Sequence, residues 1–91
     1  MNVFNKPIRI AKRNEDLIIL SVPQIDLKME VNNNVWEFVS FLMKEEKFDL
    51  SKVEVYTEKN NITNQEDYIQ FYKELVNLGV ILHEDSKVQT D

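Results

Sequence analysis

Three consecutive runs with the alternation of β-strands stand before the segments with helical spacing, and this order constrains the fold more than any other feature of the chain. Residues 7–12 alternate apolar and charged side chains, which is typical of a strand with one face on a core. Residues 17–22 are apolar and rich in β-branched residues, and they end at Pro23, which cannot donate a hydrogen bond to a neighbouring strand. Residues 25–31 alternate at every position, which puts four apolar side chains on one face: Ile25, Leu27, Met29 and Val31. The sequence therefore predicts three strands followed by helices.

Later segments carry the spacing and the end signals of α-helices. The asparagines at 32–34 can cap a helix start, and the apolar residues that follow recur at helical intervals: Val35, Phe38, Val39, Leu42 and Met43. The last helix is expected after residues 63–66, which form a capping box, and before Gly79, which suits the left-handed conformation at a helix end. Residues 48–61 are ambiguous between helix and strand, and we expect a helix there.

The composition describes one small domain without covalent cross-links. Ninety-one residues, 43% of them hydrophobic and 10% aromatic, suffice for a single core but not for two. Cysteine is absent and His83 is the only histidine, so disulfides and thiolate metal sites are excluded and no cofactor is expected. No apolar run approaches the ~20 residues that span a bilayer, and residues 1–4 lack the design of a signal peptide. We therefore expect a soluble protein of the cytoplasm.

The charge and the scattered polar residues argue against nucleic-acid binding and against catalysis. A net charge of −5 repels phosphate, and the basic residues between positions 6 and 13 are followed by two acidic ones, so we interpret them as a solvated face. No serine has a general base at a motif spacing, and an adjacent acid pair such as Glu45-Glu46 is more often solvated than catalytic or metal-binding. A chain with one glycine has no glycine-rich phosphate loop. We expect no catalytic residue and no metal ligand.

The last helix carries a wider apolar surface than a small core requires. At ~100° per residue its apolar side chains cover roughly 180°, against about 100° for a helix that covers a core on one side. One border of this surface consists of Ile69 and Val76 beside Lys73, and the other of Phe71 and Leu78. Two interpretations stay open: the helix is enclosed by the core on several sides, or it lines an apolar groove with a lysine at its rim.

The alternating run at 25–31 offers a second sign of a binding surface. A regular strand at the edge of a sheet presents unpaired N–H and C=O groups, which natural proteins normally protect with bulges, proline or charge. Lys28 and Glu30 give partial protection. If this edge is open, it can accept an extended peptide as a further strand, with backbone hydrogen bonds for affinity and side-chain pockets for selection.

Four segments together resemble the PqqD-like RiPP recognition element, the leader-peptide-binding domain of ribosomal peptide maturation systems. They are the run from Asp16 to Leu20, the strand that ends at Val31, the helix that opens Val35-Trp36-Glu37-Phe38-Val39, and the ending from Asp67 to Val80. The likeness is greatest to the versions found at the front of ThiF-like proteins and in thiazole/oxazole-forming systems.

The resemblance implies an α+β fold, a winged helix-turn-helix in which a three-stranded antiparallel sheet is followed by three helices. It also implies that a precursor leader binds as a fourth strand beside the third strand, in a groove walled by the third helix. The candidate peptide-binding residues are accordingly Ile25, Asp26, Leu27, Lys28, Met29, Glu30, Val31, Ile69, Tyr72, Lys73 and Val76.

The leading hypothesis is a non-catalytic module of residues 6–84, followed by a frayed tail at 85–91. It binds the leader of a ribosomally synthesised precursor and presents it to a modifying enzyme, ThiF-like or YcaO-like, without nucleic acid or membrane. Two alternatives stay open. One is a winged-helix DNA-binding regulator, which the negative charge opposes, and the other is an acidic protein-interaction module.

Overall fold

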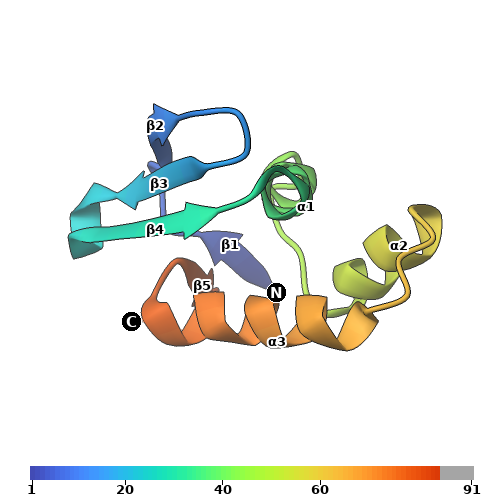
Figure 1. Ribbon diagram of the computed structural model, residues 1–91. Helices are drawn as coiled ribbons and strands as arrows, with labels where there is room; N and C mark the ends of the chain where they lie inside the picture. Colours follow the sequence, from blue (N-terminus) through green and yellow to red (C-terminus); the bar gives the residue numbers. More distant parts are fainter. Residues whose placement is uncertain (85–91) are drawn as a thin grey trace, which may run out of the picture.

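The computed structural model describes residues 1–84, apart from the side chain of Lys12. These residues form the strands and helices β1-β2-β3-β4-α1-α2-α3-β5, with a short 3-10 helix, η1, between β3 and β4 (Figure 1). The fold is thus of the mixed α+β class that the sequence predicts. The expected tail at 85–91 lies outside the described residues. Among the described helices, none is long and apolar enough to cross a membrane.

Three strands form an antiparallel sheet in the order β2-β3-β4. They are β2, Arg9–Arg13; β3, Ile18–Val22; and β4, Leu27–Val31. The pairing of β3 with β4 is regular over all five residues, whereas the pairing of β2 with β3 shifts between Ile10 and Lys12. The extra residue, Ala11, makes a β-bulge in β2. The two edges of this sheet therefore differ in regularity.

The third strand is two residues shorter than the alternation predicts. Pro23–Ile25 forms η1, and Asp26 has φ 53°, in the left-handed region, so neither Ile25 nor Asp26 continues the strand. The Asp26 N–H donates to the Pro23 carbonyl at 3.0 Å and closes the turn. Alternating side chains do not show where a chain reverses, and here the turn between β3 and β4 uses two of the alternating residues.

A second, two-stranded sheet joins the two ends of the described chain. β1, Asn2–Phe4, pairs antiparallel with β5, Ile81–His83, and Asn2 also forms a bridge with Phe48. Phe4 is buried in the core. The sequence prediction of one sheet followed by three helices is therefore incomplete, because the strands are divided between two sheets. The expected domain start at residue 6 also leaves out β1.

Three helices follow β4. They are α1, Asn33–Met43; α2, Ser51–Lys59; and α3, Gln65–Leu78. The side chain of Asn32 caps α1 by accepting a hydrogen bond from the Val35 N–H at 2.8 Å. The N-cap of α3 is Asn64 and not the first residue of the predicted capping box, and its side chain makes no capping bond. Gly79, with φ 88°, ends α3 as predicted.

The core lies between the β2-β3-β4 sheet and the helices, with Phe38 of α1 fully buried in it. The Phe38 ring centroid lies 5.2 Å from that of Tyr56, 5.2 Å from that of Tyr68 and 6.4 Å from that of Phe71. This aromatic group connects α1 with α2 and α3. Figure 1 shows the result: α3 runs below β4, the outermost strand on that side of the sheet.

Candidate functional site

β4 is an edge strand, because it pairs with β3 and with no other strand of the described chain. The direction of its free backbone groups follows from the turn between β2 and β3. There the Asn14 N–H donates to the Leu17 carbonyl at 2.8 Å, so Leu17 turns its backbone groups towards β2. Backbone groups alternate sides along an antiparallel strand, so every second residue from Ile18 bonds to its partner in β4. The N–H and C=O groups of the remaining β4 residues, Lys28 and Glu30, therefore face the open edge.

Five of the predicted peptide-binding residues make up β4. Val31 is buried, and Leu27 and Met29 are partly buried against the core, so these three fix the strand to the protein. The side chains of Lys28 and Glu30 are exposed on the outer face of the sheet. β4 is therefore fixed to the core by three side chains, while the backbone groups of Lys28 and Glu30 face the open edge.

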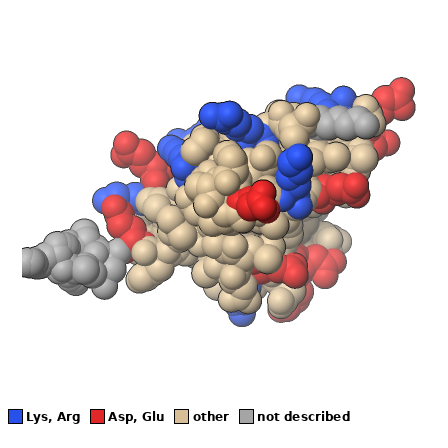
Figure 2. Space-filling view, turned by 90° about the vertical axis from the view of Figure 1, so that its left-hand side faces the viewer, with Lys and Arg blue, Asp and Glu red and all other residues tan. Residues whose placement is uncertain are grey.

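The other two predicted strand residues lie at the start of this edge. Asp26 is exposed in the turn, and Ile25 lies over Gly79, with its Cδ1 3.7 Å from the position that a Cβ would take there. Figure 2 looks at this end of the molecule, where Lys and Arg gather over the upper part above a broad surface without charge. Ile25 and Leu78, the residue before Gly79, are 37% and 44% exposed. Apolar contact is therefore available beyond the first residue of β4.

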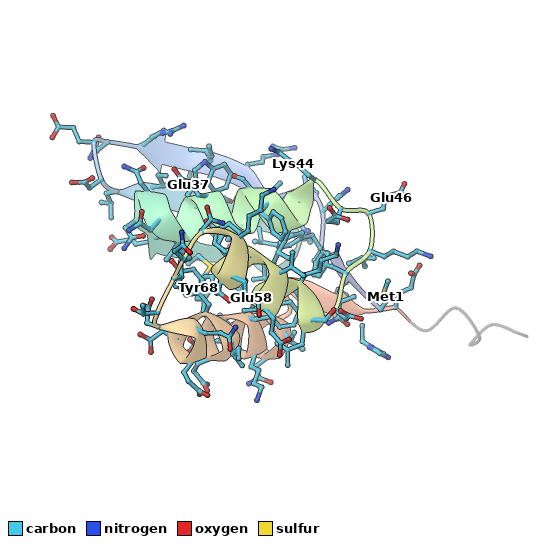
Figure 3. The ribbon with its side chains drawn as sticks, turned by 90° about the vertical axis from the view of Figure 1, so that its right-hand side faces the viewer. Met1, Glu37, Lys44, Glu46, Glu58 and Tyr68 are labelled. Atoms are coloured by element: carbon cyan, nitrogen blue, oxygen red, sulfur yellow. The ribbon has the colours of Figure 1, made fainter. Side chains whose placement is uncertain are left out.

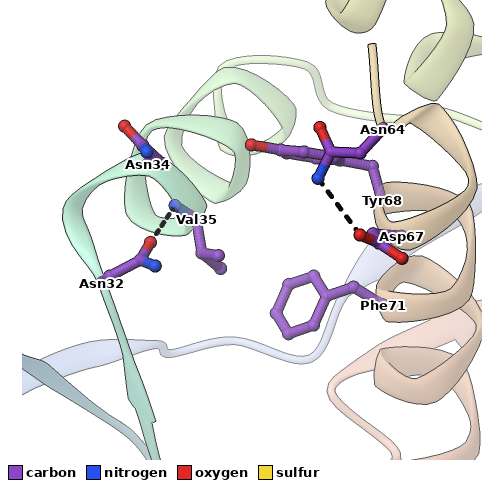
Figure 4. A pocket seen from close by; sticks show the side chains of 7 residues that line it. All are labelled: Asn32, Asn34, Val35, Asn64, Asp67, Tyr68 and Phe71. Carbon is purple, nitrogen blue, oxygen red and sulfur yellow. Dashed lines mark hydrogen bonds between the residues drawn. The ribbon is translucent and has the colours of Figure 1, made fainter. Parts of the chain in front are cut away.

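A cavity of about 230 Å³ opens at the other end of β4, where the chain enters α1 (Figure 4). Its apolar lining is Val35 from α1 with Tyr68 and Phe71 from α3. Its polar lining comes from the starts of the same two helices: Asn32, Asn34, Asn64 and Asp67. The Asn64 Nδ2 donates to the Asp67 Oδ2 at 3.2 Å. A side chain of an extended segment that lies along β4 and continues past Val31 can enter this cavity.

α3 turns the Phe71 border of its apolar surface towards β4, and not the border formed by Ile69 and Val76. Phe71 packs against the buried side chains of the sheet and lines the cavity opposite Val35. Gln65, one helical turn before Ile69, donates through its Nε2 to the Thr57 Oγ1 of α2 at 2.8 Å, so this side of α3 faces α2. The sequence shows both borders of the helix but not which of them meets the sheet.

The remaining predicted wall residues differ in burial. Tyr72 is a core residue with 3% of its surface exposed, and its ring meets that of Phe48 nearly at a right angle. Its hydroxyl accepts a hydrogen bond from the Asn2 Nδ2 at 2.6 Å. Burial raises the pKa of Tyr72, and the Asn2 hydrogen bond partly opposes this. Lys73 is exposed. Of the predicted wall residues, Tyr72 is thus part of the core, while a peptide-binding role for Ile69, Lys73 and Val76 stays a prediction; the side of α3 that packs on the sheet carries Phe71.

In the described part of the chain, no group of three or more His, Cys, Asp or Glu side chains is placed to hold a metal ion. No family model, curated protein or solved structure matches this chain. The function is therefore inferred from the site itself.

Proposed function

We propose that the protein binds an extended peptide segment as a fourth strand beside β4. The observation that carries this proposal is the regular pairing of β4 on one side and its open backbone groups at Lys28 and Glu30 on the other. Within the described chain, no backbone hydrogen bond outside the β3–β4 pairing involves these two residues. A peptide can therefore bond to them without displacing a protein strand.

The energies indicate that backbone bonding alone does not hold the peptide. Ordering about five peptide residues costs roughly 5–10 kcal/mol. Four new backbone hydrogen bonds, two at each open residue, contribute about 2–6 kcal/mol. Apolar anchors must supply the difference, and the cavity lined by Val35, Tyr68 and Phe71 lies where the strand ends. The edge and the cavity thus support one binding mode together.

The proposed partner is the leader region of a ribosomally synthesised precursor peptide, which the domain presents to a modifying enzyme. In this proposal β2-β3-β4 and α1-α2-α3 form the winged helix-turn-helix of the PqqD-like recognition element, with β1 and β5 as additions to it. The exposed acidic residues Glu66, Asp67 and Glu74 on α3 repel phosphate groups, so this helix is poorly suited to be a DNA recognition helix.

The test is a selection of displayed random peptides against the 91-residue chain, followed by amide hydrogen exchange with a selected peptide bound. The amides of Lys28 and Glu30 should exchange more slowly in the complex, because they then donate to the peptide backbone. The matched control is the other edge of the same sheet, where the amides of Ile10 and Arg13 should be unchanged. A bound peptide that leaves Lys28 and Glu30 unprotected contradicts strand addition, as does a selection that enriches no sequence.

A further inference from the structure

We infer that the end of the β4 edge is a site for a basic side chain, arginine in preference to lysine, carried by the bound peptide. The inference rests on the proposed strand addition, because the peptide backbone brings the side chain to the cavity. It adds the chemical class of the residue that is recognised there.

Two adjoining hollows surround Tyr68. The 230 Å³ cavity at the end of β4 and a second one of about 450 Å³ share the lining residues Asn34, Asn64 and Tyr68. The second hollow continues between α1 and the turn that joins α2 to α3, with Glu37 in its lining. Figure 3 looks onto this end of the molecule, where Glu37 lies on α1 and Tyr68 lies between α1 and α3. The two hollows therefore meet at Tyr68, and a long side chain with a polar end is the kind of group that can reach from one to the other.

The charged residues that line the two hollows are both acidic. They are Asp67 in the first and Glu37 in the second, and no basic residue that the structure describes lines either hollow. Among the described side chains, neither carboxylate belongs to an ion pair. The Asn64 amide donates to one oxygen of Asp67, and the Asn32 carbonyl accepts from the Val35 N–H, which leaves the other Asp67 oxygen and the amide carbonyls of Asn34 and Asn64 as acceptors. A donor-rich cation fits this lining better than a carboxylate or a purely apolar group.

The N-termini of α1 and α3 weaken the binding of a cation, because each carries roughly half a positive charge. Asp67 lies in the first turn of α3 and compensates that helix end directly. Glu37 adds a second full negative charge. Two full negative charges against two partial positive ones leave the joined space favourable to a cation.

The aromatic lining distinguishes arginine from lysine. Tyr68 is held edge-on against Phe38 at an interplanar angle of 90°, and Phe71 lies one helical turn further along α3. A guanidinium group can stack on an aromatic face and still donate two hydrogen bonds to one carboxylate, whereas an ammonium group is a hydrated point charge. The methylene stem of the same side chain covers Val35.

The test measures how tightly the peptides selected as described above bind to two variants. Each variant removes one negative charge from the first turn of α3. Selected peptides should carry Arg or Lys just beyond the segment that pairs with β4. Asp67→Asn should weaken such a peptide about tenfold or more, the loss expected for one hydrogen bond between charged groups. Glu66→Gln removes a neighbouring carboxylate outside both hollows and should change affinity less than about twofold. Asp67→Lys should shift the selection towards Asp or Glu.

The outcomes separate this site from strand addition. If selected peptides protect Lys28 and Glu30 but lack a basic residue, or bind Asp67→Asn normally, the basic-side-chain site is wrong and strand addition stands. If no peptide protects β4, strand addition fails, and Nα-acetyl-arginine methylamide is titrated alone. If this compound changes the NMR chemical shifts of the Asn34 and Asn64 side-chain amides in the parent protein but not in Asp67→Asn, the basic-side-chain site stands. If it changes them in neither protein, the site is wrong.

Discussion

The two edges of the β2-β3-β4 sheet have the same length but opposite capacities for pairing. On β4 the open backbone groups belong to Lys28 and Glu30, two residues apart, which is the spacing that an added strand requires. On β2 the bulge at Ala11 leaves Ile10 and Arg13 facing outward, three residues apart. One inserted residue therefore makes one edge irregular, and its absence leaves the other edge with the regular spacing that the proposed strand addition requires.

The surroundings of the two edges differ in the same direction. β4 ends at a cavity with apolar and acidic lining, and α3 runs below it. β2 carries two exposed charged side chains, Arg9 and Arg13, and β4 also carries two, Lys28 and Glu30, so exposed charge does not distinguish the edges. The irregular pairing of β2 discourages an added strand, whereas a cavity at the end of a regular edge offers one an anchor.

The anchor at the β4 edge requires that Phe71, and not Tyr72, is the side chain of α3 that faces this edge. Tyr72→Ala should destabilise the fold by about 3–5 kcal/mol, because it empties a buried aromatic site and removes the partner of Asn2. Phe71→Ala should cost less stability, since Phe71 is only partly buried, yet weaken peptide binding by more than about 1 kcal/mol. Urea unfolding and titration calorimetry measure both quantities, with Val76→Ala as the control that should leave affinity unchanged. Normal affinity in Phe71→Ala would break the assignment.

Neighbouring residues of β4 should respond differently to proline. Met29→Pro removes a donor to β3 and leaves a carbonyl unpaired, which should destabilise the fold by about 1–3 kcal/mol. Glu30→Pro removes a donor on the open side, so it should reduce stability less but abolish measurable peptide binding. Unfolding and binding experiments on the two variants decide it. Equal destabilisation by both prolines would show that the orientation derived from the Asn14–Leu17 hydrogen bond is incorrect.

Local signals predicted the elements that depend on neighbours in sequence. The Asn32 cap and the helix end at Gly79 are confirmed, and the strand predicted at residues 17–22 is present as Ile18–Val22, because each rests on the chemistry of a few adjacent residues. β1 and β5 were not predicted. Each is three residues long, and they pair between the two ends of the described chain, so their stability comes from a contact that no local pattern shows.

The candidate site was predicted in its strand but not in its helix. Alternation predicted a strand at residues 25–31, of which Leu27–Val31 is a strand and Ile25 and Asp26 belong to a turn. Alternation did not show whether this strand lies at the edge of the sheet, which the structure places there. The helical spacing showed two apolar borders on α3 and gave no means to choose between them. That choice depends on how α3 packs against α2 and the sheet, which is a tertiary property.

Removing the bulge should make the two edges alike. Deleting Ala11 leaves Ile10 opposite Leu20 and Lys12 opposite Ile19 in an unbroken ladder, so the outward groups of β2 gain the regular spacing. We expect the variant to self-associate weakly through β2 or to accept a second peptide. Sedimentation at several protein concentrations and binding stoichiometry detect the two outcomes. A monomer with a single peptide site would mean that Arg9 and Arg13, and not the bulge, protect this edge.

Two tyrosines that differ in position should report which side of α3 the peptide occupies. Burial raises the pKa of Tyr72 above its usual value of 10.0, and burial together with Tyr68 and Glu37 raises that of Tyr56. Above about pH 10 the unfolded chain loses these protons while the folded chain keeps them, so the free energy of unfolding should fall as pH rises. A basic peptide side chain near Tyr68 should lower the pKa of Tyr56, because it offsets Glu37, and should leave Tyr72 unchanged, because Tyr72 faces β1. NMR titration of the tyrosine rings with and without peptide measures this. A shift confined to Tyr72 would place the peptide on the opposite side of α3.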